Sequence, residues 1–201
     1  DIKGGVVVTY YDKSQVFEKI EIFTAFKELS SILKKIKRHN IIGLDTIMYG
    51  QNSYRFTLSA HDENPGMINK LSKGHAYDLT TSIFDKLPDI FLDEKPSDSA
   101  ENYIRIYGRQ NNERLYKWVK EKYIARHESL TKYKVFIPKS NGTGAIGEVL
   151  STPLIGEPLI GHTQTFISVG KFDNHIEAEN CLKYIKSKFA RTLLGVLKIT
   201  Q

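Results

Sequence analysis

The proline- and glycine-rich segment at residues 148–161 (EVLSTPLIGEPLIG) places the strongest constraint on the fold of this chain. It contains Pro153, Gly156, Pro158 and Gly161. Prolines remove backbone donors and disfavour helical geometry in the residue before them. We therefore expect extended or turn structure here. A dinucleotide-binding α/β unit, which needs a helix directly after residue 147, is disfavoured.

The glycine-rich segment just before it, residues 138–148 (PKSNGTGAIGE), raises the question of a cofactor. Gly142, Gly144 and Gly147 have the G-x-G-x-x-G spacing that cradles a pyrophosphate when a helix begins inside the loop. That helix is not expected here. A P-loop also fails, because Glu148 stands where the phosphate-binding lysine is required. We expect no cofactor in this chain.

Hydrophobic patterning predicts an α+β fold with a mixed, mostly antiparallel sheet and peripheral helices. Turn-forming residues at 12–14 predict an N-terminal hairpin, and Asn174 with Glu177 forms a capping-box spacing that begins a C-terminal helix. Extended or alternating runs predict strands at 41–48, 54–58, 103–108, 133–138 and 165–169. Helical spacing of apolar residues predicts helices at 24–38 and 112–126, and residues 61–74 read as irregular.

The length of 201 residues suits one substantial core or two small lobes. We expect a single unit over 1–201 that can divide into an N-terminal lobe, 1–87, and a C-terminal lobe, 102–201. The acidic, proline-containing segment 85–101 is expected to connect them. Cys181 is the one cysteine, which excludes an internal disulfide, and its position on an apolar helix face predicts a buried thiol.

The sequence lacks the motifs of common enzymes. The six histidines are scattered, no apolar run approaches the ~18 residues of a membrane span, and no leader opens the chain, so we expect a cytoplasmic protein. The run PDIFLDEK imitates a metal-dependent nuclease signature through Asp89, Asp93 and Lys95. Only three residues separate its two halves, too few for a turn between strands. A nuclease with a metal site at these three residues stays an alternative.

The net charge of +6 and the pI near 9.2 favour an anionic partner. Glycines in the segment 138–148 allow the backbone to approach a polyanion closely, and polar side chains there and in two further segments can donate to phosphates or bases. Three donor-rich groups are therefore the candidate DNA-contacting residues: Lys139, Ser140, Asn141, Gly142, Thr143 and Gly144; His162, Thr163 and Gln164; Arg109 and Arg114.

The chain from Tyr133 onward (YKVFIPKSNGTGAIGEVLSTPLIGEPLIGHTQTFISVGKF and beyond) resembles the C-terminal region of bacterial adenine-specific DNA methyltransferases of restriction-modification systems. That group includes the Taq-type enzymes and fused restriction-methylase polypeptides. Four earlier segments are similar to parts of the same family: IKGGVVVTYYDK, SKGHAYDLTTSIF, YIRIYGR and RLYKWVKEKYI.

The resemblance implies a target-recognition domain that binds double-stranded DNA. In the family, a separate catalytic domain binds S-adenosylmethionine and holds an N-P-P-aromatic motif against a flipped adenine. Here the sole Asn-Pro pair, Asn64-Pro65, is followed by Gly66. We therefore expect a non-catalytic fragment whose parent is a site-specific adenine methyltransferase, with or without endonuclease activity. Its expected partners are DNA and the missing catalytic domain. A subunit-docking specificity component is a second alternative.

Overall fold

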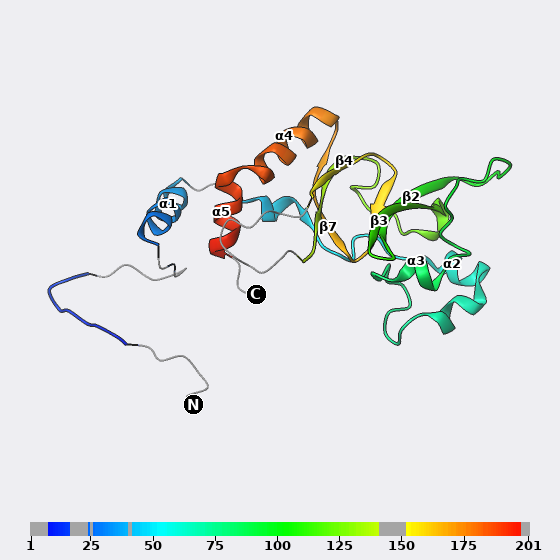
Figure 1. The fold of residues 1–201 in the computed structure, drawn as a ribbon, viewed down its shortest axis with the longest axis horizontal. Helices are drawn as coiled ribbons and strands as arrows, with labels where there is room; N and C mark the ends of the chain where they lie inside the picture. The colour runs from blue at the N-terminus through cyan, green and yellow to red at the C-terminus, as the bar shows by residue number, and fades with distance from the viewer. Residues whose placement is uncertain (1–7, 17–23, 25, 40–41, 141–151, 198–201) are drawn as a thin grey trace.

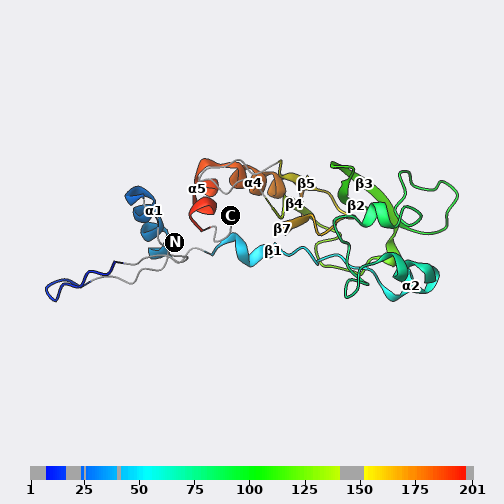
Figure 2. The ribbon, with the colours of Figure 1, turned by 60° about the horizontal axis from the view of Figure 1, so that its bottom comes forward.

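The computed structural model describes residues 8–16, 24, 26–39, 42–140 and 152–197. Helices and two mostly antiparallel sheets form an α+β fold, as the sequence predicts. Figures 1 and 2 both place the four-stranded sheet between helix α4 and the β2–β3 hairpin. In this described part of the chain, no helix is both long enough and apolar enough to cross a bilayer.

The three-stranded sheet has the order β3-β2-β6. β2 (Tyr103–Gln110) pairs antiparallel with β3 (Glu113–Lys120) and parallel with β6 (Ile160–His162). Its inner face contributes Ile104, Ile106 and Val119 to the largest hydrophobic core. Three short helices supply other members of that core: α2 (Leu58–Glu63), the 3₁₀ helix η2 (Pro65–Lys70) and α3 (Ile83–Lys86).

The helix predicted at 112–126 is wrong, because residues 113–120 form β3 and a short 3₁₀ helix, η3 (Glu121–Tyr123), follows. Asn111 and Asn112 have φ angles of 49° and 65°, the left-handed pair that a two-residue type I′ hairpin turn requires. The turn folds the chain back onto β2. Lys117 consequently lies on the buried side of the sheet.

The four-stranded sheet has the order β1-β7-β4-β5, with every pair antiparallel. Its strands are β1 (Met48–Tyr49), β4 (Tyr133–Pro138), β5 (Leu154–Gly156) and β7 (Phe166–Phe172). The strands predicted at 133–138 and 165–169 are thus confirmed. The two sheets meet through a small apolar cluster formed by Tyr107 and Ile160 from one sheet and Phe136 and Phe166 from the other.

The C-terminal helix begins as predicted but is divided in two. The Glu177 amide donates to Asn174 Oδ1 at 3.0 Å at the start of α4 (His175–Lys186). Ser187 is extended, and its hydroxyl accepts from the amide of Ala190, so a new helix, α5 (Lys188–Leu197), starts there. Cys181 is half-buried against the four-stranded sheet, and burial raises its pKa to about 11.

The N-terminal part agrees with the sequence in its turn and its helix. The Gln15 amide donates to Asp12 O at 3.2 Å, whereas the strands predicted beside this turn lie largely outside the described residues. α1 (Lys27–Arg38) falls inside the helix predicted at 24–38. The strand predicted at 41–48 is wrong, because Leu44–Ile47 form the 3₁₀ helix η1 and pairing starts only at β1.

The remaining short-range predictions are only partly met. In the strand expected at 54–58, Arg55 and Phe56 form isolated β-bridges, and α2 then begins at Leu58. The segment 61–74, expected to be irregular, holds the end of α2 and η2.

The acidic segment 85–101 is not a solvated connection. Leu87, Ile90 and Phe91 are buried in the largest core, and Leu92 exchanges two backbone hydrogen bonds of 2.8 Å with Trp118. That core contains residues from position 54 to position 130, so it includes side chains from both of the expected lobes.

Candidate nucleic-acid interface

The β2–β3 hairpin brings together two arginines that the sequence singled out. Arg109 and Arg114 are directly opposite each other across the two strands, and both are exposed. Arg109 Nη2 donates to Asn112 Oδ1, which holds that guanidinium beside the turn. The Arg114 guanidinium lies 5.6 Å from the centre of the Phe166 ring, and its Nη1 donates to Thr152 O at 3.4 Å.

These contacts bring Arg114 close to Thr152, which follows the glycine-rich segment 138–148 by four residues. Ser140 is the last described residue within that segment, and Thr152 is the first described residue after it. At the start of the segment, the Lys139 amide donates to Thr165 O at 3.0 Å. Thr165 directly precedes Phe166, whose ring Arg114 covers. Lys139 and Ser140 are exposed. The other four candidates in this segment lie outside the described residues: Asn141, Gly142, Thr143 and Gly144.

From Thr152 the described chain is extended, turns, and enters β6 without forming a helix. This agrees with the geometry expected for the prolyl segment. It also leaves residues 152–161 without the row of helical amides on which a bound pyrophosphate depends.

Gln164 remains a surface candidate. Its Nε2 donates to Asn52 Oδ1 at 2.7 Å, and its backbone amide donates to Leu79 O at 2.8 Å. The side chain is therefore held at the surface by an exposed polar partner, and it keeps its own amide oxygen for another donor.

His162 and Thr163 do not belong to this surface, and we correct the prediction that they contact DNA. Both are fully buried. His162 packs edge-on against the rings of Tyr54 and Phe136, and Thr163 donates its hydroxyl hydrogen to Thr165 Oγ1. Because β6 pairs in parallel with β2 beneath the second sheet, side chains that read as loop donors are enclosed in the interior.

The sequence did not predict the row of aromatic and arginine side chains, here called the ladder, on the hairpin face that is opposite the largest core. The Arg105 guanidinium lies 5.3 Å from the ring centre of Tyr116 and 5.6 Å from that of Trp118. Tyr116 contacts Tyr107 at 4.8 Å, and Tyr107 stacks on Phe166 at 4.4 Å. The alternation in YIRIYG predicted one half of this face, but assigning 112–126 to a helix concealed the other half.

The ladder holds its rings as neutral phenols. Burial raises the pKa of Tyr107 and of Tyr116, so neither ionises near neutrality. Arg105 also lies 3.5 Å from Glu157 and is partly exposed. Arg109 and Arg114 lie on the same face of the hairpin as the ladder but nearer the turn, and both are exposed.

Other lysines near the hairpin are engaged by carboxylates. Lys117 pairs with Asp93, and Lys122 lies 2.7 Å from Glu63. Hydrogen bonding from Lys122, with Tyr123 next, lowers the pKa of Glu63 to about 2. Lys120 also pairs with Glu63, at 3.4 Å. These three lysines therefore offer less positive charge to a polyanion than the arginines beside the turn.

The residues of the nuclease alternative do not share a site. Asp89 pairs with Lys70 at 3.4 Å, whereas Asp93 pairs with Lys117 on β3. Among the residues that the structure describes, no group of three acidic, histidine or cysteine side chains could hold a metal ion. Two carboxylates neutralised by separate lysines do not form the paired acid ligands that a catalytic metal requires.

Comparisons with protein-family models, with curated proteins and with solved structures give no match for this chain. The resemblance to target-recognition regions therefore stays a prediction from the sequence. Support for a function must come from the residues described above.

Proposed function

We propose that this chain is a target-recognition domain that binds double-stranded DNA at a specific sequence. It serves a bacterial restriction-modification adenine DNA methyltransferase and catalyses no reaction by itself. One observation carries the proposal: two exposed arginines, Arg109 and Arg114, lie opposite each other beside the hairpin turn, and Arg114 also contacts Thr152 and the ring of Phe166.

The chemistry of these side chains suits a DNA groove. The major groove is about 12 Å wide and admits a two-stranded β-ribbon, and arginine pairs bidentately with guanine O6 and N7. In this proposal the end of the β2–β3 hairpin enters the major groove, where Arg109 and Arg114 read bases. Lys139 and Ser140 contact phosphates, which fixes the register of the protein on the duplex.

The proposal assigns the chemistry to another part of the parent protein. S-adenosylmethionine and the flipped adenine would be bound by the catalytic domain, which this chain would hold on its target. A protein of this kind works on cellular DNA and is therefore cytoplasmic. Neither the cofactor nor the catalytic residues are expected within these 201 residues.

Selection of bound duplexes from a randomised library tests the proposal. The unmodified chain should enrich one sequence, and Arg109→Ala and Arg114→Ala should each relax preference at a particular base pair. Each should weaken binding to the selected sequence by about 1–3 kcal/mol. Arg126→Ala is the matched control, because this arginine is exposed and does not belong to the hairpin.

Four results would count against the proposal. Enrichment of no sequence would exclude recognition by this chain. Equal weakening of binding to all sequences would mean that the two arginines contact phosphates and not bases. Binding to a partner subunit with no binding to DNA would favour the docking alternative. Cleavage of plasmid in magnesium that Asp93→Ala abolishes would favour the nuclease.

A further inference from the structure

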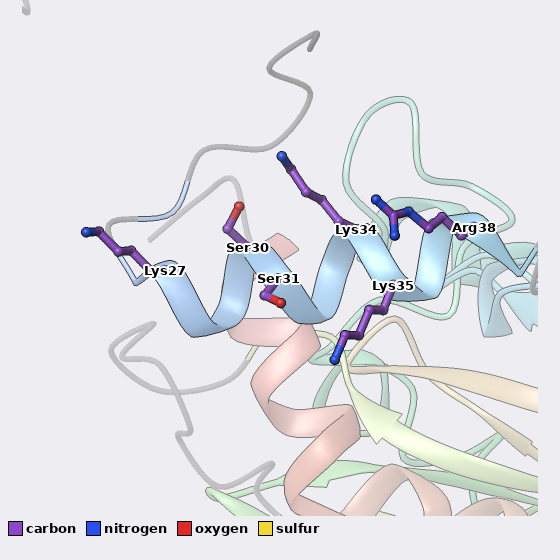
Figure 3. A pocket seen from close by; sticks show the side chains of 6 residues that line it. All are labelled: Lys27, Ser30, Ser31, Lys34, Lys35 and Arg38. Atoms are coloured by element: carbon purple, nitrogen blue, oxygen red, sulfur yellow. The ribbon is translucent and has the colours of Figure 1, made fainter. Parts of the chain in front are cut away.

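Helix α1 carries a basic face that the proposed recognition surface does not use. Six residues line one hollow on this helix, and Figure 3 shows their side chains projecting from it: Lys27, Ser30, Ser31, Lys34, Lys35 and Arg38. At 100° per residue these positions fall within an arc of roughly 140°. Four cations and two hydroxyls therefore share a single side of the helix. Glu28 is the one acidic residue in α1.

The opposite side of α1 is apolar and turned toward the protein. Leu33 is 8% exposed, and Leu29 and Ile36 are half-buried. Figures 1 and 2 both place α1 beside α5. The four cations on the other side are exposed. Lys35 and Arg38 make no ion pair with a carboxylate in the part of the chain that the structure describes, and the same holds for Lys27.

This chemistry matches a nucleic-acid backbone. Lysine, arginine and serine side chains are the usual donors to phosphate oxygens. The distance along the axis from Lys27 to Arg38 is about 16 Å, enough to span several phosphates of a duplex. An amphipathic helix that binds a membrane must insert its apolar face into the lipid. Leu33 is buried and Leu29 and Ile36 are half-buried, so these side chains are only partly available for insertion, which favours DNA over a bilayer.

We propose that α1 is a second DNA-binding element, which holds the phosphate backbone and reads no bases. The inference rests on the proposed function, because it assumes that the hairpin binds the same duplex. In Figures 1 and 2, the four-stranded sheet lies between α1 and the β2–β3 hairpin. DNA that contacts both elements is therefore covered over a longer stretch than the hairpin alone would protect.

The test is the salt dependence of binding in a variant of the full chain that combines Lys27→Gln, Lys35→Gln and Arg38→Gln. Glutamine has nearly the helix propensity of lysine and arginine, so α1 should persist, and circular dichroism checks this. The control combines Lys73→Gln, Lys95→Gln and Arg126→Gln, three exposed positions elsewhere. Each triple variant removes three positive charges, which lowers the net charge from +6 to +3.

Loss of α1 contacts should change affinity but not specificity. Each phosphate contact contributes about 0.9 to the slope of log affinity against log salt, so three contacts contribute up to about 2.7. Over the tenfold range from 1 M to 0.1 M salt, a slope of 2.7 corresponds to as much as roughly 500-fold in affinity. For the α1 variant we expect at least a tenfold loss of affinity at 0.1 M salt and a slope reduced by one or more. The preferred sequence from the library should be unchanged, and the control variant should bind like the unmodified chain.

The outcomes separate this inference from the proposed function. An α1 variant with the slope and affinity of the unmodified chain would overturn the inference, while the hairpin still recognised its site. An unmodified chain that binds no duplex would overturn both. Vesicles containing phosphatidylserine supply a further arm: binding to them that the α1 substitutions abolish, without any change on DNA, would assign the basic face to membranes instead.

Discussion

Protonation of His162 should destabilise the fold at mildly acidic pH, because the ring is fully buried and burial disfavours its charged form. The Nδ1 atom lies 3.0 Å from the carbonyl oxygen of Thr163, which can only accept, so Nδ1 carries the hydrogen. The Nε2 atom lies 3.3 Å from Ser168 Oγ and is left to accept from that hydroxyl. A second proton on the ring would place a positive charge in a fully buried site.

The size of the effect follows from the shift in pKa. Burial lowers the pKa of His162 from 6.5 to about 4. Between these values the unfolded chain binds a proton that the folded chain does not, so the free energy of unfolding falls as pH falls from 6.5 toward 4. Below about 4 both states are protonated and this contribution stops changing. At 1.36 kcal/mol per pH unit, the full loss is about 3 kcal/mol.

Urea unfolding of the unmodified chain and of His162→Asn at pH 7.5, 6.5, 5.5 and 4.5 measures this contribution. The asparagine amide can donate to the Thr163 carbonyl without titrating, so the variant should be less stable at pH 7.5 but should lose less on acidification. Between pH 7.5 and 4.5 the stability difference should shrink by about 2–3 kcal/mol. Carboxylates that titrate in both proteins cancel in the difference.

His39→Asn supplies the control, because this histidine is exposed at the end of α1. Its stability curve should run parallel to that of the unmodified chain. If the curve of His162→Asn is also parallel from pH 6.5 to 4.5, His162 does not stay neutral in the folded state and the reasoning from burial fails.

Substitutions at three further positions test the packing around the two sheets and the cap of α4. Lys134→Met removes a buried amino group that lies within hydrogen-bond distance of four backbone carbonyls, and should cost about 3 kcal/mol in urea unfolding. Gly108→Ala should lower the melting temperature, with a loss of about 1–3 kcal/mol, because the new Cβ would overlap the ring of Phe84. Asn174→Ala should cost about 1 kcal/mol through loss of the α4 cap, whereas Asn174→Ser should restore most of it.

Local signals in the sequence predicted those elements whose ends are fixed by nearby residues. The α4 cap depends on a side chain and an amide three positions apart, and β4 is a short apolar run that ends at a proline. The strand β3 was not predicted, because the spacing of Leu115, Trp118 and Val119 fits one face of a helix as well as it fits a strand. The pair Asn111 and Asn112 decides between helix and hairpin, because asparagine tolerates left-handed geometry and so allows a hairpin turn.

Interactions between distant parts of the chain account for the other failures. The composition of 85–101 is acidic, yet Leu87, Ile90 and Phe91 find buried positions because the β2–β3 hairpin lies above them. His162 reads as a loop donor until β6 pairs in parallel with β2, more than 50 residues earlier in the chain. Burial of that kind depends on which strands become neighbours, and the pattern of a single segment does not contain this information.

The two proposed DNA elements make opposite predictions about specificity, and that contrast separates recognition from the general attraction of a basic protein to DNA. Arginines beside the hairpin turn should determine which sequence is bound, since a base contact discriminates by about 1–3 kcal/mol. Cations on α1 should determine how strongly any sequence is bound and how steeply binding falls with salt. A chain that was merely basic would respond alike to charge removal at the hairpin, at α1 and at the control positions.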